Sequence, residues 1–125
     1  MNGIILKPGR EKSVRRHHPW IYSGAIEKVE GDPQPGQTVT VFGSTREPLA
    51  LAAYNPGSSI VARIWSWEFT EEINKSFFKN KLRKAIDQRR RNPFLQKSTN
   101  AFRLLYAESD QLPGLVLDQY DQWLV

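Results

Sequence analysis

The sequence predicts an α+β protein in which a small β-barrel is followed by a long helix and the first strands of a second α+β domain. Short apolar and β-branched segments recur between residues 4 and 65, with turn-forming residues between them, as in a closed or nearly closed barrel. From Ile73 the apolar residues recur at helical spacing. From Ala101 the pattern returns to that of strands.

The barrel strands are expected at 4–7, 25–30, 38–42, 49–54 and 60–65. The segment 38–42 is rich in β-branched residues, and the loop at 31–36 is dense in glycine and proline. In the last of these strands, Val61 and Arg63 should lie on the face opposite Ala62 and Ile64, because side chains alternate along a strand.

The helix is predicted to begin after Thr70 as its N-cap and to end near Arg91, before Asn92 and Pro93. Its apolar arc is broad, which favours contacts on more than one side. Basic residues form a stripe along it, which is usually a solvated face: Lys75, Lys79, Arg83 and Arg90.

A polar linker is expected at 96–100, followed by strands at 101–106 and 115–118 and a last strand that starts near Trp123. Because a strand needs hydrogen-bonding partners, we expect the chain to be a fragment of a longer protein. The expected division is a barrel domain at 1–68, a connecting helix and linker at 69–100, and the truncated start of a strand-rich domain at 101–125.

Composition excludes several kinds of site. The 125 residues include no cysteine and two adjacent histidines, so disulfides, thiolate metal sites, histidine-rich metal sites and a cysteine nucleophile are not expected. We expect no metal site. The sequence has no apolar run long enough to cross a bilayer and no signal-peptide pattern, so we expect a cytoplasmic protein without a membrane partner.

The net charge of +5 is unevenly distributed: +2 over residues 1–60, +6 over 61–100 and −3 over 101–125. With a pI near 9.7, the basic regions indicate a nucleic-acid partner.

The basic loop, residues 7–20, is the candidate RNA-binding segment. Gly9 provides a corner, and a short helix with Val14 inward should follow until Pro19 stops it. Clustered guanidinium groups suit phosphate oxygens, and an indole offers a stacking face for a base, although Trp20 could equally pack in the core. The candidate RNA-binding residues are Lys7, Arg10, Lys12, Arg15, Arg16, His17, Trp20 and Arg63.

The roles of the two histidines and of Arg63 are conditional. His17 and His18 can hydrogen-bond RNA or simply satisfy the backbone of a turn. Arg63 joins the surface only if its strand lies at the barrel edge. Separately, Glu108, Ser109 and Asp110 suggest a hydrolase or a Mg²⁺ site, but acidic residues in a turn more often bond their own backbone.

Several stretches resemble the RNA cytosine-5 methyltransferases that act on large-subunit ribosomal RNA. The N-terminal PUA domain of that family contains segments similar to KPGREKS (7–13), RHHPWIYSGAI (16–26), AYNP (53–56) and IVARIW (60–65). The most specific match is RLLYAESDQLPGLVLDQY (103–120), which resembles the hairpin that opens the family's central domain. Gln111 and Gln119 depart from the family, where glycine and arginine respectively are common.

The resemblance implies a PUA-like barrel at 1–68 and a catalytic Rossmann-like domain, which binds S-adenosylmethionine, outside this chain. Methylation of cytosine C5 needs an enzyme thiolate, which this chain lacks, so no catalytic or cofactor-binding residue is expected within it. The resemblance implies RNA, ribosomal RNA in particular, as the partner, and a homodimer as an option for the full-length protein.

Two alternatives stay open at this point. The chain could be a stand-alone RNA-binding or ribosome-associated adaptor module. It could also be a structural domain whose basic helix docks an acidic protein.

Overall fold

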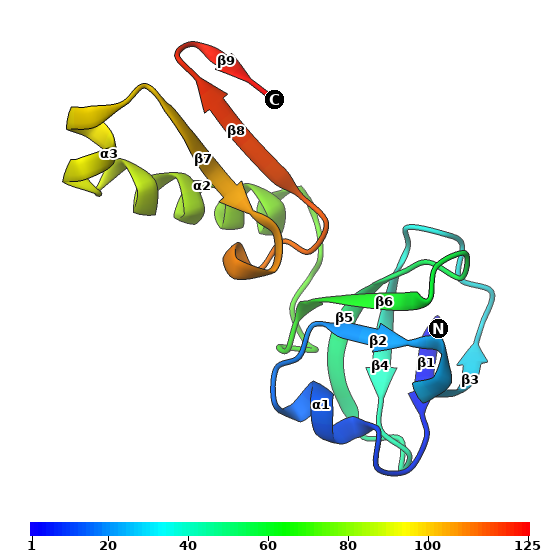
Figure 1. The fold of residues 1–125 in the computed structure, drawn as a ribbon. Helices are drawn as coiled ribbons and strands as arrows, with labels where there is room; N and C mark the ends of the chain where they lie inside the picture. The colour runs from blue at the N-terminus through cyan, green and yellow to red at the C-terminus, as the bar shows by residue number, and fades with distance from the viewer. The chain divides into compact units, whose positions relative to one another are not determined.

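The computed structural model describes residues 1–125, apart from the side chain of Gln96. The chain forms two compact units, Met1–Glu71 and Glu72–Val125. Figure 1 traces the elements of each unit. The predicted fold class is confirmed, with the barrel present as a curled, open sheet.

The N-terminal unit is a six-stranded sheet in the order β2-β6-β5-β4-β1-β3. The β1–β4 pair is parallel and the other pairs are antiparallel. All five expected strands match observed strands to within one residue at each end, and β2 is an additional strand that was not predicted. The bounds are β1 Gly3–Leu6, β2 Trp20–Tyr22, β3 Ile26–Glu30, β4 Thr38–Phe42, β5 Pro48–Tyr54 and β6 Ile60–Ser66.

The curl of this sheet follows from one short connection. β2 and β3 lie at opposite ends of the strand order, yet only the 3-10 turn η1 (Ser23–Ala25) joins them. A flat six-stranded sheet would hold its edges about 24 Å apart. The chain from Tyr22 to Ile26 can reach only about 14 Å. The sheet therefore has to bend until its two edges approach each other, as Figure 1 shows.

The inner face of the curl is the core of the unit. Successive residues of each strand point to opposite faces, as the pleat requires. The burial of Ala62 and Ile64 agrees with the predicted alternation in β6, but Val61, which was predicted on the face of Arg63, is also buried in the core cluster. The short helix α1 (Glu11–Arg15) adds Val14 to this cluster. The fully buried members include Ile4, Leu6, Val41, Ala50, Ala52 and Ala62.

In the C-terminal unit, the helix α2 (Lys75–Arg90) lies against β7 (Ala101–Tyr106) of a three-stranded sheet in the order β7-β8-β9. The other strands are β8 (Val116–Tyr120) and β9 (Trp123–Leu124). Among the described residues, neither α2 nor any other helix has both the length and the apolar character needed to span a bilayer. Buried residues of this unit include Phe77, Ala85, Leu104, Leu105 and Leu112.

The start of α2 corrects one sequence prediction. Asn74 is the N-cap, and its side chain accepts a hydrogen bond from the Phe77 N–H at 3.0 Å. Thr70 instead donates its hydroxyl hydrogen to Glu68, outside the helix. Both residue types are good caps, but the cap at Asn74 is the one that places Phe77 on the buried face of the helix.

The expected linker at 96–100 is also partly wrong. A third helix, α3 (Pro93–Ser98), occupies most of it. Pro93 stands in the first turn, where its missing N–H costs nothing, and the Asn92 side chain accepts a hydrogen bond from the Phe94 N–H at 3.0 Å.

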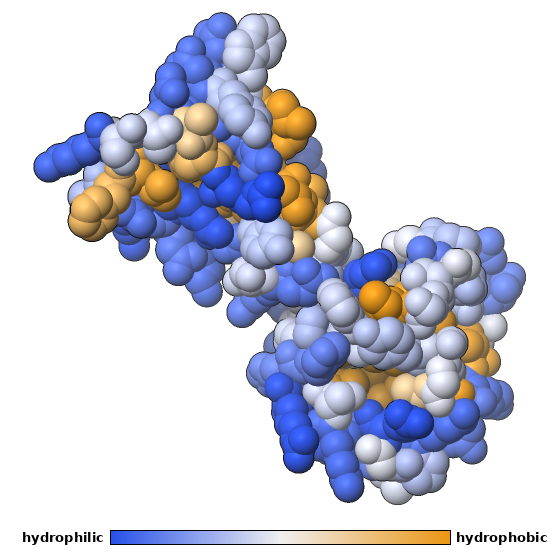
Figure 2. Space-filling view, viewed as in Figure 1, coloured by the Kyte–Doolittle hydropathy of each residue, from blue (hydrophilic) through white to orange (hydrophobic). Residues whose placement is uncertain are grey.

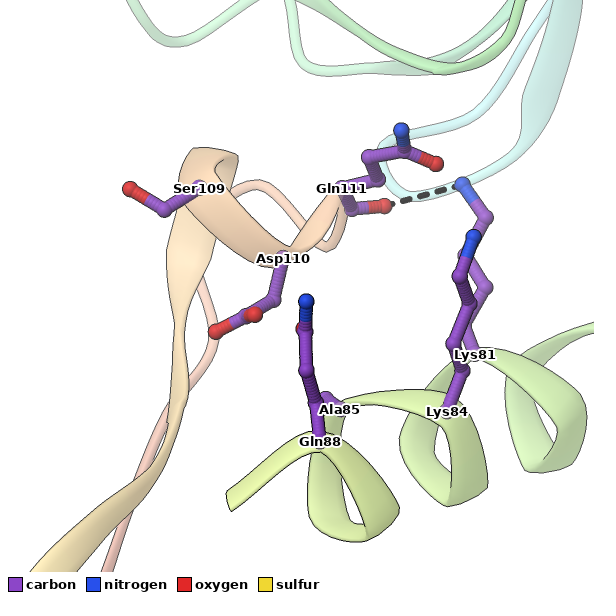
Figure 3. Close-up of a pocket in the computed structure, with 7 residues that line it drawn as sticks. All are labelled: Lys81, Lys84, Ala85, Gln88, Ser109, Asp110 and Gln111. Carbon is purple, nitrogen blue, oxygen red and sulfur yellow. Dashed lines mark hydrogen bonds between the residues drawn. The ribbon is translucent and has the colours of Figure 1, made fainter. Parts of the chain in front are cut away.

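The turn η2 (Ala107–Asp110) is anchored to α2 by charge. Arg89 donates two hydrogen bonds to the Asp110 carboxylate, at 2.6 and 2.8 Å, and Lys81 donates to the Gln111 carbonyl at 2.9 Å. Figure 3 shows the small pocket between these elements, with Lys81 reaching the Gln111 carbonyl from α2. Gln111 has a left-handed φ of 60°, a conformation that glycine adopts most easily.

The pKa of Asp110 reflects two opposing effects. Its side chain is only 5% exposed, and burial alone would raise the pKa. Hydrogen bonds from Arg89 and from the Tyr106 N–H outweigh that effect, so the pKa is lowered.

Replacing Asn74 by alanine should destabilise the C-terminal unit by about 1 kcal/mol, because the Phe77 N–H loses its acceptor. Chemical denaturation followed by circular dichroism measures this change. The Thr70→Ala variant is the matched control and should stay within about 0.5 kcal/mol of the unmodified protein. A larger loss from Thr70→Ala than from Asn74→Ala would contradict the assignment.

Asp110→Asn should lower the free energy of unfolding of the C-terminal unit by about 1.5–3 kcal/mol at neutral pH. Since folding lowers the Asp110 pKa, this carboxylate stabilises the unit above about pH 4, and the benefit disappears as the pH falls through the folded-state value. The difference between the two proteins should therefore shrink in acid. The exposed Asp121→Asn change is the control and should leave the free energy of unfolding at neutral pH within about 0.5 kcal/mol of the unmodified protein.

Candidate RNA-binding surface

The basic loop is shaped by two left-handed residues. Gly9, with φ 84°, turns the chain after β1, and the Arg10 N–H donates to the Lys7 carbonyl at 3.0 Å. Helix α1 then begins, with Val14 only 1% exposed, as predicted. His17, with φ 62°, ends it. The helix therefore ends at Arg15, earlier than the proline at position 19 would require.

Trp67 fixes the loop from the opposite end of the unit's sequence. Its indole N–H donates to the Val14 carbonyl at 2.8 Å. The His17 ring stacks on the Trp67 ring, with the two centroids 4.5 Å apart and the planes 13° from parallel. Sequence reasoning missed Trp67, because no local pattern links it to a residue 53 positions away.

A shallow groove of about 550 Å³ runs along the exposed side of α1. None of the described residues that line it is acidic, and Figure 2 shows the strongly hydrophilic surface over α1. The groove is called the α1 groove below. Its lining residues are Gly9, Arg10, Lys12, Ser13, Arg16, His17, His18 and Pro19.

The α1 groove brings together four of the residues predicted from sequence: Arg10, Lys12, Arg16 and His17. Within the described part of the chain, its three cations form no salt bridge with a carboxylate. Three exposed cations without internal counter-charges can bind an anion such as a phosphate group. His18, which was considered together with His17 as an RNA contact, lines the same groove, and so does Ser13, which was not predicted.

Arg15 points elsewhere. Its guanidinium group donates to the Glu47 carboxylate at 2.8 Å, on the turn between β4 and β5. Hydrogen bonds from the Thr45 hydroxyl and the backbone, together with the Arg15 charge, hold the pKa of Glu47 below its usual value. Arg15 therefore has an internal counter-charge that its neighbour Arg16 lacks among the described ion pairs.

The remaining predicted residues lie outside the α1 groove. Trp20 and Arg63 face each other across the β2–β6 pair, and β6 is an interior strand, so Arg63 is not at the edge of the sheet. Trp20 is half-buried, and its backbone N–H donates to His18 Nδ1 at 3.3 Å. Lys7 is exposed just after β1.

In the acidic turn at 108–110, Asp110 has a structural role. Its carboxylate accepts hydrogen bonds from Arg89 and from the Tyr106 N–H. Within the described residues, no group of three or more histidine, cysteine, aspartate or glutamate side chains is arranged to hold a metal ion. The geometry therefore gives the hydrolase interpretation no support.

Comparison with known proteins finds a domain-family match in the N-terminal unit and similar proteins that are named as ribosomal RNA methyltransferases. Residues 4–67 match the family model described as a PUA-like domain. Two curated relatives carry the name "Ribosomal RNA large subunit methyltransferase I". The one from Vibrio parahaemolyticus is 50% identical over 123 residues, which cover 98% of this chain and 30% of the relative. The one from Erwinia tasmaniensis is 44% identical over 122 residues, which cover 98% of this chain and 31% of the relative. The chain thus spans less than a third of their length.

Two solved structures share the fold. A putative SAM-dependent methyltransferase from Streptococcus mutans has a TM-score of 0.81 and 21% identity, and the match covers 99% of this chain and 32% of that one. A putative methyltransferase complexed with SAH has a TM-score of 0.82 and 20% identity, with 99% and 31% coverage. Similarity at this level of identity supports the arrangement of elements in each unit.

Trp67→Phe should destabilise the N-terminal unit by about 0.5–1.5 kcal/mol, because the Val14 carbonyl loses its donor while most of the stacking surface remains. Hydrogen exchange at the amides of Arg16 and His18 should speed up. Tyr22→Phe, at a position 48% exposed, is the aromatic control and should change neither quantity. Equal exchange rates in the Trp67→Phe variant and the unmodified protein would refute a role for the indole N–H in fixing α1.

Proposed function

We propose, since this chain belongs to the PUA-like domain family, that it is the RNA-recognition portion of an S-adenosylmethionine-dependent methyltransferase. The substrate that we propose is cytosine C5 of large-subunit ribosomal RNA. The observation that carries the proposal is the α1 groove, in which three cations lie together on a fixed scaffold without an acidic lining residue. The names of the curated relatives support ribosomal RNA as the substrate class.

In this proposal the α1 groove binds the RNA backbone. Arg10 and Arg16 offer planar guanidinium groups that suit bidentate contacts with phosphate, and Lys12 adds a mobile point charge. The rings of His17 and His18 supply polar edges at the same groove. Such contacts hold RNA without reading its sequence, so base selection would depend on RNA shape and on other parts of the parent protein.

The predicted residues that do not line the α1 groove are proposed to contribute less to RNA binding. Lys7 extends the positive surface beside the groove, and Arg15 contributes less because Glu47 neutralises it. Trp20 directly follows the groove residues in the chain, and its half-buried ring is more suited to packing than to stacking on a base. Arg63 pairs with it in register but lies on the interior strand β6, so we do not assign it an RNA contact.

The methyl transfer itself is assigned to another part of the parent protein. Activation of cytosine C5 requires a thiolate nucleophile, and this chain contains no cysteine. We place the S-adenosylmethionine site in that other part of the parent protein as well. A Rossmann-like domain binds its cofactor at a glycine-rich turn between a strand and the helix that crosses over to a parallel neighbouring strand. Among the described residues, β1 and β4 are the one parallel pair, and they are not joined by such a glycine-rich unit.

A stand-alone RNA-binding module is the less favoured alternative. It accounts for the α1 groove equally well. It does not account for a likeness to much longer relatives that extends over 98% of this chain, including the C-terminal unit.

The test is binding of the 125-residue chain to a structured fragment of large-subunit ribosomal RNA over a salt series. The triple variant Arg10→Ala, Lys12→Ala, Arg16→Ala should bind at least about tenfold more weakly. It should also flatten the plot of log affinity against log salt by about 2–3, since each lost phosphate contact removes about 0.7–0.9 from the slope.

Arg46→Ala is the matched control, because Arg46 is also a surface cation of this unit but is paired with Glu30 at 2.7 Å. It should bind like the unmodified chain, and Arg15→Ala should lose less affinity than Arg16→Ala. An unchanged salt slope in the triple variant would exclude the α1 groove as the phosphate-binding surface. A complete lack of binding at low salt would move RNA recognition to the rest of the parent protein.

A further inference from the structure

Helix α2 has a second apolar stripe besides the one buried against β7. Phe77 and Ala85 form the buried face. Phe78, Leu82 and Ile86 recur every four residues on a different side, where they line an open groove. The broad apolar arc seen in the sequence thus consists of two faces, and the sheet of the unit covers one of them. We call the other the α2 groove.

The α2 groove has the geometry of a helix-packing site. One wall is the apolar row Phe78, Leu82 and Ile86, and the other is the row Lys75, Lys79 and Arg83, also spaced by four residues. A groove between two such rows accepts the side-chain ridge of a second helix. Its volume of about 710 Å³ is large enough for several leucine-sized side chains.

The charges beside the α2 groove are mostly of one sign. Lys75, Lys79 and Arg83 follow one wall, and Arg90 stands at its C-terminal end. Among the described salt bridges, none involves any of these four cations. Asp87 interrupts the row near the C-terminal end. The complementary surface is therefore acidic opposite the first three cations and neutral or basic opposite Asp87.

We propose that the α2 groove docks an amphipathic helix of a partner protein, with apolar side chains in the groove and acidic residues against Lys75, Lys79 and Arg83. The apolar wall favours a protein helix over RNA, because Leu82 and Ile86 offer neither a hydrogen-bonding group nor a stacking face and Phe78 is the single aromatic ring of the row. The groove also suits an anionic membrane less well, because Asp87 would repel the lipid headgroups. This interface is separate from the α1 groove and does not depend on the function proposed for it.

The test uses the 125-residue chain and a synthetic helical peptide of about 18 residues, with leucines along one side and glutamates flanking them. Nuclear magnetic resonance of the labelled chain should show chemical-shift changes at the residues that line the α2 groove and none at α1. Leu82→Ser and Lys79→Glu should each weaken peptide binding at least about tenfold. Lys84→Glu is the matched control on another side of α2 and should bind within about threefold of the unmodified chain.

Two further controls test whether binding depends on the acidic residues of the peptide and whether a loss of binding reflects unfolding of α2. A peptide with the same leucines but lysine in place of glutamate should not bind, because it would meet the cations of the α2 groove. Circular dichroism of Leu82→Ser shows whether α2 still folds, and Lys79→Glu tests the groove without removing an apolar side chain. Equal binding of both peptides, or equal affinity in all three variants, would overturn the proposal. So would binding of RNA or of phosphatidylglycerol vesicles at this groove in place of the acidic peptide.

Discussion

The short connection between β2 and β3 is the constraint on which the N-terminal unit depends. It ties the two edges of the sheet together, so the sheet must curl and its inner face has little room. The central strands meet this requirement with small residues: Ala50, Ala52 and Ala62 are completely buried. Larger side chains from β1 and β4 fill the remaining space, which is the alternation of small and large residues expected inside a small barrel.

The same curl gives the candidate RNA-binding loop its support. Val14 closes the core, and the Trp67 indole holds the backbone of α1 at that point. The cations of the α1 groove therefore project from a segment fixed by packing and by a hydrogen bond. A fixed arrangement loses less conformational freedom on binding than a flexible loop with the same charge would lose. If the α1 groove binds phosphate as proposed, its affinity depends in part on Val14 and Trp67, which do not line the groove.

The sequence predicted those parts that depend on local pattern. The strands β4 and β7 were predicted to the residue, because β4 is rich in β-branched residues and β7 is a short, largely apolar segment that follows a polar stretch. Strand β2 was missed, since three residues are too few to show a period. Thr70 and Asn74 are both good caps, and only the burial of Phe77 distinguishes them. Likewise, Arg15 and Arg16 are equivalent in sequence until the distant Glu47 engages one of them.

The edges of the curled sheet have a consequence for how the protein behaves when many copies are crowded together. An exposed strand edge is a template on which another chain can add a strand, and this is a common route to aggregation. Here β2 is only three residues long, and β3 carries the charged residues Glu27, Lys28 and Glu30. Neither edge is a long apolar template. The short β2 and the charged β3 therefore protect the N-terminal unit against edge-to-edge association.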